Sequence, residues 1–352
     1  MMNIYTIVLI ILVVTGCLNV VFRQRWVVFV TTILLALFAG LRATNIGPDT
    51  ISYYTDYWLR TMDFNFHSQF EPGYSLLVKI FVFFNVNANM FFLLFAFLTL
   101  FLLGIFFHRY SYLPIFSLAY YYARFFLTRD MNQIRQSLAA AILLFSLKYM
   151  AKRDLKRFTV IVLLASLFHS VALIMFVPYV LINYFGFKSD EGLPLKYGIV
   201  YIASLIASLF ITPIITFIFN LVGLGTDYLT ASVYTSGGGL LNPVLLFQSV
   251  ISFFLAYIME HRDTTLFRRT LYKTYMVGTL ILLLLNQYRV LAGRTSTVLV
   301  TVEAIVVVDI IKTLVPRGGQ TIVTAAVIVL TFFLISESTL SIGYLPYVTF
   351  LN

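Results

Sequence analysis

The chain is short of charge. Only 11% of its 352 residues are Asp, Glu, Lys or Arg, whereas soluble proteins carry about 25%. Hydrophobic residues make up 61% of the sequence, and no stretch is long and polar enough to fold as a separate soluble domain. A chain with so little charge must turn most of its surface toward lipid. We therefore predict an integral membrane protein that forms a single domain over residues 1–352.

The sequence also lacks the usual signs of disulfides, metal sites and nucleotide sites. Its one cysteine, Cys17, lies in a hydrophobic run, so no internal disulfide is expected. There is no zinc-ligand spacing, no Walker loop, no nucleophile elbow and no Asp-x-Asp pair on the expected outer face. We therefore expect neither a metal nor a cofactor. The net charge of +10 is typical of cytoplasmic loops in a membrane protein, so we expect no nucleic-acid partner.

Ten hydrophobic runs are suited to cross a bilayer, which takes about 20 apolar residues per helix. They cover residues 4–22, 26–41, 90–107, 112–127, 135–151, 197–222, 244–260, 271–285, 295–311 and 320–336. Residues 74–86 are too short for a full crossing, and residues 158–185 are too long for one span and too short for two. We interpret the first as interfacial or re-entrant and the second as a broken helix pair. The predicted fold is an all-α polytopic transmembrane bundle.

Positive charge predicts the orientation of this bundle. A topology that follows the positive-inside rule leaves eight of the 24 Lys and Arg residues outside the cytoplasm. Seven of the eight are arginines, whose planar fork of donors matches phosphate and carboxylate. The eight residues are Arg42, Arg60, Lys79, Arg124, Arg129, Arg135, Arg289 and Arg294. This bias favours an oxyanion site on the outer face; the alternative is that these arginines only pair with nearby acids.

The first outer loop, residues 42–73, combines turn residues with aromatic residues. The run Gly47-Pro48-Asp49 is typical of a turn, and Asp49 is suited to be the N-cap of a helix that begins at Thr50. Tyr53 and its aromatic neighbours can anchor the loop near the headgroups or stack against sugar rings. The loop ends in Glu71-Pro72-Gly73-Tyr74.

Three later segments contain polar side chains at positions that we expect to lie within the membrane. Asn132, Arg135 and Gln136 share one helix face, and an arginine there is costly unless it faces a cavity and a partner. His169 lies in the predicted helix break, where a core role and a site role are both open. Arg289 and Arg294 follow later in the chain. The outer loop 223–243 contains Tyr234 and three consecutive glycines, which suggest a mobile gate.

These elements together resemble the EpsG/Wzy-type family of bacterial polysaccharide repeat-unit polymerases, which build O-antigens and exopolysaccharides. The resemblance covers nearly the whole chain and rests on the order of several short motifs. The matching residues are Gly40-Leu41-Arg42 with Gly47, Asp49, Thr50 and Tyr53; Glu71-Pro72-Gly73-Tyr74; Ile134-Arg135-Gln136; Phe168-His169-Ser170; Arg294; and Leu345-Pro346-Tyr347. The last arginine motif has two candidates, Arg289 and Arg294.

The resemblance implies a fold like that of GT-C-type membrane glycosyltransferases and a reaction that needs no metal. A growing glycan would move from undecaprenyl diphosphate onto a lipid-linked repeat unit, at the outer face of the bacterial cytoplasmic (inner) membrane. The implied partners are the lipid-linked oligosaccharide, membrane lipid and a chain-length regulator. An O-antigen ligase and a flippase for the same glycans remain alternatives, although loop 223–243 is modest for a ligase and no internal repeat supports a flippase.

The residues divide into three expected roles in this reaction. Diphosphate binding is assigned to Arg42, Arg135 and Arg294, with Arg289 as the second choice, because preorganised arginines stabilise a departing diphosphate. The base is Asp49 or His169, with Asp49 favoured, and Glu71 orients the acceptor. The expected sugar contacts are Tyr53, Gln136 and Tyr234.

Overall fold

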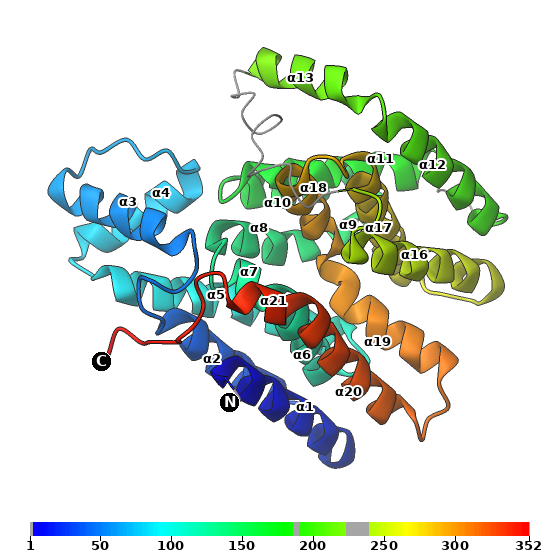
Figure 1. Cartoon of the computed structure of the whole chain (residues 1–352), viewed down its shortest axis with the longest axis horizontal. Helices are drawn as coiled ribbons and strands as arrows, with labels where there is room; N and C mark the ends of the chain where they lie inside the picture. The colour runs from blue at the N-terminus through cyan, green and yellow to red at the C-terminus, as the bar shows by residue number, and fades with distance from the viewer. Residues whose placement is uncertain (1–2, 186–189, 223–238, 352) are drawn as a thin grey trace. The chain divides into compact units, whose positions relative to one another are not determined.

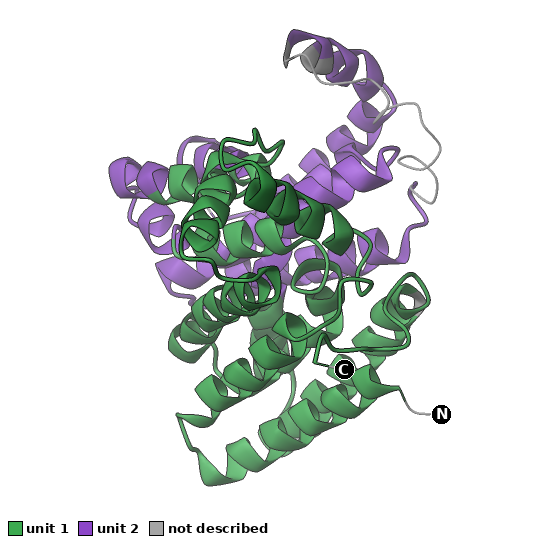
Figure 2. Ribbon diagram, turned by 90° about the vertical axis from the view of Figure 1, so that its left-hand side faces the viewer, with its two compact units in different colours: residues 1–145, 161–172, 304–352 green, residues 146–160, 173–303 purple. Residues whose placement is uncertain are grey.

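The computed structural model describes residues 3–185, 190–222 and 239–351 (Figure 1). Within these ranges the regular structure is helical, and the nearest thing to a strand is one isolated bridge between Arg42 and Thr349. The predicted all-α class is confirmed. The described residues form two compact units (Figure 2): residues 1–145, 161–172 and 304–352 make unit 1, and residues 146–160 and 173–303 make unit 2. Whether the chain forms a single domain stays a prediction.

Unit 1 contains the first half of the chain and its C-terminal helices. Its elements are α1 (Ile4–Phe22), α2 (Val27–Gly40), α3 (Thr50–Met62), α4 (Pro72–Phe83), α5 (Ala88–Tyr110), α6 (Pro114–Tyr121), the π-helix η1 (Tyr122–Phe126), α7 (Leu127–Arg129), α8 (Ile134–Leu144), α20 (Gln320–Thr331), the π-helix η4 (Phe332–Ser336) and α21 (Glu337–Leu340). Most of α19 (Glu303–Leu314) and the second half of α10 (Leu155–Ser166) also belong to it.

Unit 2 contains the middle of the chain. Its elements are α9 (Leu147–Ala151), α11 (Phe176–Tyr184), α12 (Leu193–Ser208), α13 (Ile211–Val222), α16 (Pro243–His261), α17 (Leu266–Leu284), α18 (Arg289–Leu299) and the 3₁₀ turn η3 (Val300–Val302). The 3₁₀ segment η2 (Ser170–Met175) runs from unit 1 into this unit.

Small residues allow α2 and α5 to pack closely in unit 1. A Cβ atom added to Gly40 would lie 2.6 Å from the Leu93 Cα atom, and one added to Gly104 would lie 2.6 Å from the Thr32 hydroxyl. Close approach through small side chains is how membrane helices gain van der Waals contact, because lipid supplies little hydrophobic drive between them. This pair of helices supports the loop that starts at Arg42.

Three of the predicted spans are confirmed as single helices long and apolar enough to cross a membrane. They are α1, α5 and α16. The predicted span 197–222 is wrong as one helix, because α12 and the start of α13 are bent by 70° around residues 209–210. Pro213 explains the break: its ring would clash with the Leu209 carbonyl in a continuous helix. The predicted span 271–285 lies in α17, which has 19 residues but carries Arg268, Arg269 and Lys273 in its first half. The remaining predicted spans correspond to shorter helices, so the total number of spans stays a prediction.

The structure bears on the length and continuity of segments 74–86 and 158–185, while their placement in the membrane stays a prediction. Helix α4 has only 12 residues, about 18 Å, which is well short of the hydrocarbon thickness. The segment 158–185 is broken, because α10 ends at Ser166 and helical structure resumes at Ser170. His169 therefore lies in a helix break, as predicted.

Candidate functional site

In unit 1, the Glu71 carboxylate lies close to two other predicted site residues, Arg135 and His169. The Glu71 Oε2 atom forms an ion pair with the Arg135 guanidinium. The Glu71 Oε1 atom accepts a hydrogen bond from the Ser170 backbone N–H at 3.2 Å and lies 3.8 Å from His169 Nδ1. The three side chains are only 15–19% exposed, so the ion pair is partly shielded from water. We call these four residues the Glu71 cluster.

Gly73 explains why the end of loop 42–73 meets the helix break after α10. Its backbone N–H donates to the Leu167 carbonyl at 2.8 Å, and an added Cβ atom would lie only 2.7 Å from that oxygen. The carbonyl is accessible because α10 ends one residue earlier, at Ser166. A side chain at position 73 would push α4 away from the break and separate Glu71 from His169.

Aromatic rings surround the Arg135 guanidinium. Its central carbon lies 4.2 Å from the ring centroid of Phe70, 5.6 Å from that of Tyr53 and 5.9 Å from that of Tyr74. Rings at these distances attract a cation through their negative faces. Tyr53 is 3% exposed and Gln136 is 1% exposed. Their direct contact with a sugar stays a prediction.

The backbone determines how His169 can act. The Val171 N–H donates to His169 Nδ1 at 3.2 Å. A nitrogen that accepts a hydrogen bond carries a lone pair, so the neutral ring holds its proton on Nε2. In this tautomer His169 is a donor at Nε2.

Arg42 follows α2 and is buried beneath the C-terminal segment. Its Nη1 atom donates to the Ala39 carbonyl at 2.5 Å, while its Nε and Nη2 atoms have no hydrogen-bond partner among the described residues. Only 3% of the residue is exposed. Burial lowers the pKa of the guanidinium, and Tyr344, followed by Tyr54, opposes that shift. Arg42 is thus a buried cation with unused donors.

The late Leu345-Pro346-Tyr347 motif covers this arginine. The Ala43 N–H donates to the Val348 carbonyl at 2.9 Å, and the Phe350 N–H donates to the Leu41 carbonyl at 3.1 Å. The Tyr347 hydroxyl donates to the Phe38 carbonyl at 2.8 Å, with the two rings 4.7 Å apart. The first and last motifs of the sequence therefore meet in one place.

The loop before α3 fixes the Asp49 backbone. Its N–H donates to the Asn132 side-chain oxygen at 2.6 Å. Helix α3 begins at Thr50 as predicted, but the Asp49 carboxylate accepts no hydrogen bond from the first turn of the helix, so its predicted role as a side-chain cap is wrong. The reason is that Asp49 has φ −85° and ψ −9°, a helical conformation, whereas a capping side chain needs an extended residue. No hydrogen bond or ion pair within the described ranges involves the half-buried carboxylate.

Two consecutive residues of α3 lie near two of the predicted site arginines, Arg135 and Arg42. Tyr53 lies beside Arg135. Burial raises the pKa of Tyr54 to about 12, and the charge of Arg42 acts in the opposite direction. Helix α3 thus connects Arg42 and the C-terminal residues 345–350 with the Glu71 cluster.

The predicted site did not include Asp130, a buried acid whose charge acts on Arg42 and Arg129. It accepts hydrogen bonds from the Tyr121 hydroxyl at 2.7 Å and the Ser137 hydroxyl at 2.9 Å. Burial raises the pKa of Asp130 to about 6, although both hydrogen bonds and Arg129 act to lower it. Its neighbour Arg129 lies 4.5 Å from the Phe125 ring centroid. The available signal was its position between two expected helices, one residue from an arginine.

The remaining predicted residues belong to unit 2 or lie outside the described ranges. Arg289 is exposed at the first position of α18, and Arg294 is half-buried further along the same helix. Their role in diphosphate binding stays a prediction, and Tyr234 lies outside the described residues. Glu303 is buried and accepts from the Tyr275 hydroxyl at 3.0 Å, so it serves the core of this unit.

Comparison with known families identifies the chain. The model of the EpsG family matches residues 25–349, which include every motif described above. The chain belongs to the EpsG family. Comparisons with curated proteins and with solved structures give no match. This EpsG-family protein is therefore a membrane protein of polysaccharide biosynthesis, with a function of the polysaccharide polymerase type.

Proposed function

We propose that this EpsG-family protein transfers a growing glycan from undecaprenyl diphosphate onto a lipid-linked repeat unit, at the outer face of the cytoplasmic membrane. The acceptor hydroxyl oxygen bonds to the anomeric carbon of the donor glycan, and the bond from that carbon to the diphosphate breaks. A base takes the hydroxyl proton, and undecaprenyl diphosphate leaves as an anion. The reaction needs anion-binding groups and a base close to the acceptor.

The buried guanidinium of Arg42 is the observation that carries this proposal. Two of its nitrogens have no hydrogen-bond partner among the described residues. A buried charge without a partner costs several kcal/mol, and an anion with well-placed oxygens offsets that cost. A diphosphate meets this need, because its oxygens accept several hydrogen bonds at once.

Arg135 supplies a second cation beside Tyr53 of α3. Its guanidinium is already paired with Glu71, so a bound diphosphate would share the guanidinium with this carboxylate. Glu71 also holds the Ser170 backbone beside His169. We therefore assign Glu71 a positioning role toward Arg135 and His169, in addition to its expected contact with the acceptor.

The hydrogen-bond pattern favours Asp49 as the base. His169 Nδ1 already accepts from the backbone, which suits the ring for donating from Nε2 to a diphosphate oxygen. The Asp49 carboxylate is half-buried on a fixed loop and can accept a proton from a hydroxyl within hydrogen-bond reach. Tyr53 and Gln136, which are buried, would then support these groups from the protein side.

Deletion of the gene, followed by inspection of the surface glycan, tests the proposal. Loss of a polymerase leaves single repeat units attached to the cell surface. Loss of a ligase leaves no glycan attached, and loss of a flippase leaves the lipid-linked units inside the cell. Either of the last two results would replace the proposed function by that alternative.

The outer location of the reaction has its own test. In a Cys17→Ser background, a cysteine at Thr61 should react with an impermeant thiol reagent in intact cells whose outer layers are permeable. Cysteines at Thr264 and Gly318 should not react. Labelling at Thr264 would reverse the proposed orientation.

A further inference from the structure

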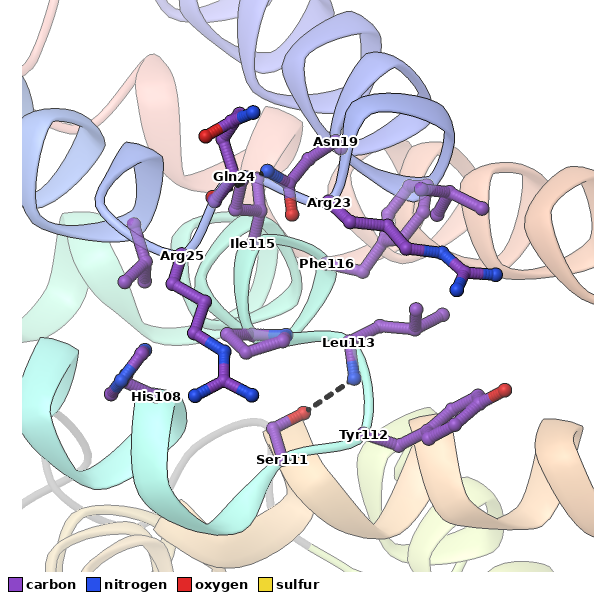
Figure 3. A pocket seen from close by; sticks show the side chains of 14 residues that line it. Asn19, Arg23, Gln24, Arg25, His108, Ser111, Tyr112, Leu113, Ile115 and Phe116 are labelled. Carbon is purple, nitrogen blue, oxygen red and sulfur yellow. Dashed lines mark hydrogen bonds between the residues drawn. The ribbon is translucent and has the colours of Figure 1, made fainter.

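A separate cationic cavity of about 630 Å³ lies at the end of unit 1 where α1 and α5 end and α2 and α6 begin. The turn 23–26 and the turn 111–113 form its two sides (Figure 3). Arg42 follows the other end of α2, about 20 Å away for a 14-residue helix. The cavity is therefore distinct from the proposed polymerase site.

The lining of this cavity is positively charged. Arg23 and Arg25 leave the same turn, and Figure 3 shows both side chains on the side that faces the turn 111–113. No acidic residue lines the cavity, and neither arginine forms an ion pair within the described ranges. Outside the lining, the Lys312 ammonium lies 3.9 Å from the ring centroid of Tyr112, which is one of the lining residues. The charge comes from side chains, because two helix N-termini and two C-termini meet here and their dipoles offset one another.

Both turns are held in shape before any ligand binds. The Asn19 side chain donates to the Gln24 carbonyl at 2.8 Å, and Arg23 closes α1 in a left-handed conformation with φ +52°. On the other side, Ser111 accepts from the Leu113 N–H at 3.2 Å and shares a hydrogen bond with Ser117 at 2.7 Å. A fixed backbone reduces the entropy that a ligand loses on binding.

Apolar side chains complete the cavity, which points to a lipid rather than a soluble anion. Val28, Ile115 and Phe116 contribute to its wall. Trp26 is 61% exposed beside it, and tryptophan in a membrane protein favours the level of the headgroups. An inorganic phosphate would use only the arginines, whereas a phospholipid uses both the charge and the apolar wall.

We propose that this cavity binds the phosphodiester headgroup of an anionic glycerophospholipid, with phosphatidylglycerol as the simplest probe. Arg23 and Arg25 contact the phosphate, and the first acyl carbons lie against Val28 and Phe116. The site faces the leaflet that the positive-inside rule places on the cytoplasmic side. Basic pockets between membrane helices recognise anionic lipid headgroups in this way.

Native mass spectrometry of the purified full-length protein tests the site, with phosphatidylglycerol titrated into the detergent solution. The Arg23→Gln/Arg25→Gln variant should need about thirtyfold more phosphatidylglycerol for half-occupancy, since each basic residue near a lipid surface contributes about one kcal/mol. The Arg23→Lys/Arg25→Lys variant keeps the charge and should bind within a few-fold of the wild type. A matched control, Arg262→Gln/Arg317→Gln, removes two exposed arginines outside the cavity and should bind as the wild type does.

Competition separates the lipid from a free anion. Phosphatidylcholine and inorganic phosphate should not displace bound phosphatidylglycerol. Equal phosphatidylglycerol binding by the wild type and the Arg23→Gln/Arg25→Gln variant would overturn the proposal. Displacement by millimolar inorganic phosphate would also overturn it, because the cavity would then be a site for a soluble anion. The glycan phenotype of a gene deletion does not enter this assay, so the two proposals fail independently.

Discussion

Glu71 and Arg135 form an ion pair that connects the end of loop 42–73 to the start of α8. The same carboxylate accepts from the Ser170 N–H in the break after α10. Three segments far apart in the sequence are therefore held by one side chain. A carboxylate in this position sets the direction of the arginine fork and the distance to His169.

Glu71→Gln tests this positioning role. The amide oxygen can still accept from Ser170, but the variant has no charge with which to hold Arg135. We expect polymerisation by the purified protein to fall at least about tenfold, because a misdirected donor stabilises the leaving diphosphate poorly. The control is Asp154→Asn, which removes a carboxylate from the exposed Arg157 ion pair and should leave the rate unchanged. A rate for Glu71→Gln equal to that of the control would remove Glu71 from the site.

Arginine-to-lysine variants test whether geometry matters as well as charge. Arg42→Lys, Arg135→Lys and Arg294→Lys each keep a cation but lose the fork of donors. We expect a loss of about a hundredfold or more in polymer formation for each variant, the scale seen when one preorganised donor is removed. The exposed Arg157→Lys should behave as the wild type. Full polymer from Arg42→Lys and Arg135→Lys would make these arginines ordinary structural cations.

The fold was largely predictable because hydropathy sets it. The runs at 4–22, 90–107 and 244–260 became α1, α5 and α16 within a few residues. The interruption around residues 209–210 was missed, because a window over 197–222 averages away the effect of Pro213 on the preceding turn. The break at His169 was predicted, since a length between one span and two left no regular alternative.

The site was only partly predictable. Residue types and membrane depth indicated Arg42, Arg135 and His169 as candidates. The partners of these residues depend on contacts between distant segments, such as the isolated β-bridge between Arg42 and Thr349. The Asp49 cap failed for a local reason, because its backbone dihedral angles cannot be read from residue type.

Gly47→Ala tests the loop that holds Asp49. Gly47 has φ +88°, and an added Cβ atom would lie 2.0 Å from the Met131 carbonyl oxygen. We expect the free energy of unfolding to fall by roughly 1–3 kcal/mol, the scale of local backbone strain, with a lower thermal midpoint in detergent. The control is Gly318→Ala, where nothing lies within 4 Å of the added atom and stability should not change. Equal midpoints for the two variants would show that the loop adapts freely.

The most direct test of the account is polymerisation in vitro, with purified protein and lipid-linked repeat units, comparing the wild type with Asp49→Asn. The wild type should convert single units into a ladder of longer glycans. Asp49→Asn should bind the lipid diphosphate with unchanged affinity and form no ladder, because its amide cannot take the acceptor proton. A ladder of near-normal length and rate from Asp49→Asn would contradict the account, since Asp49 would then serve only the start of α3.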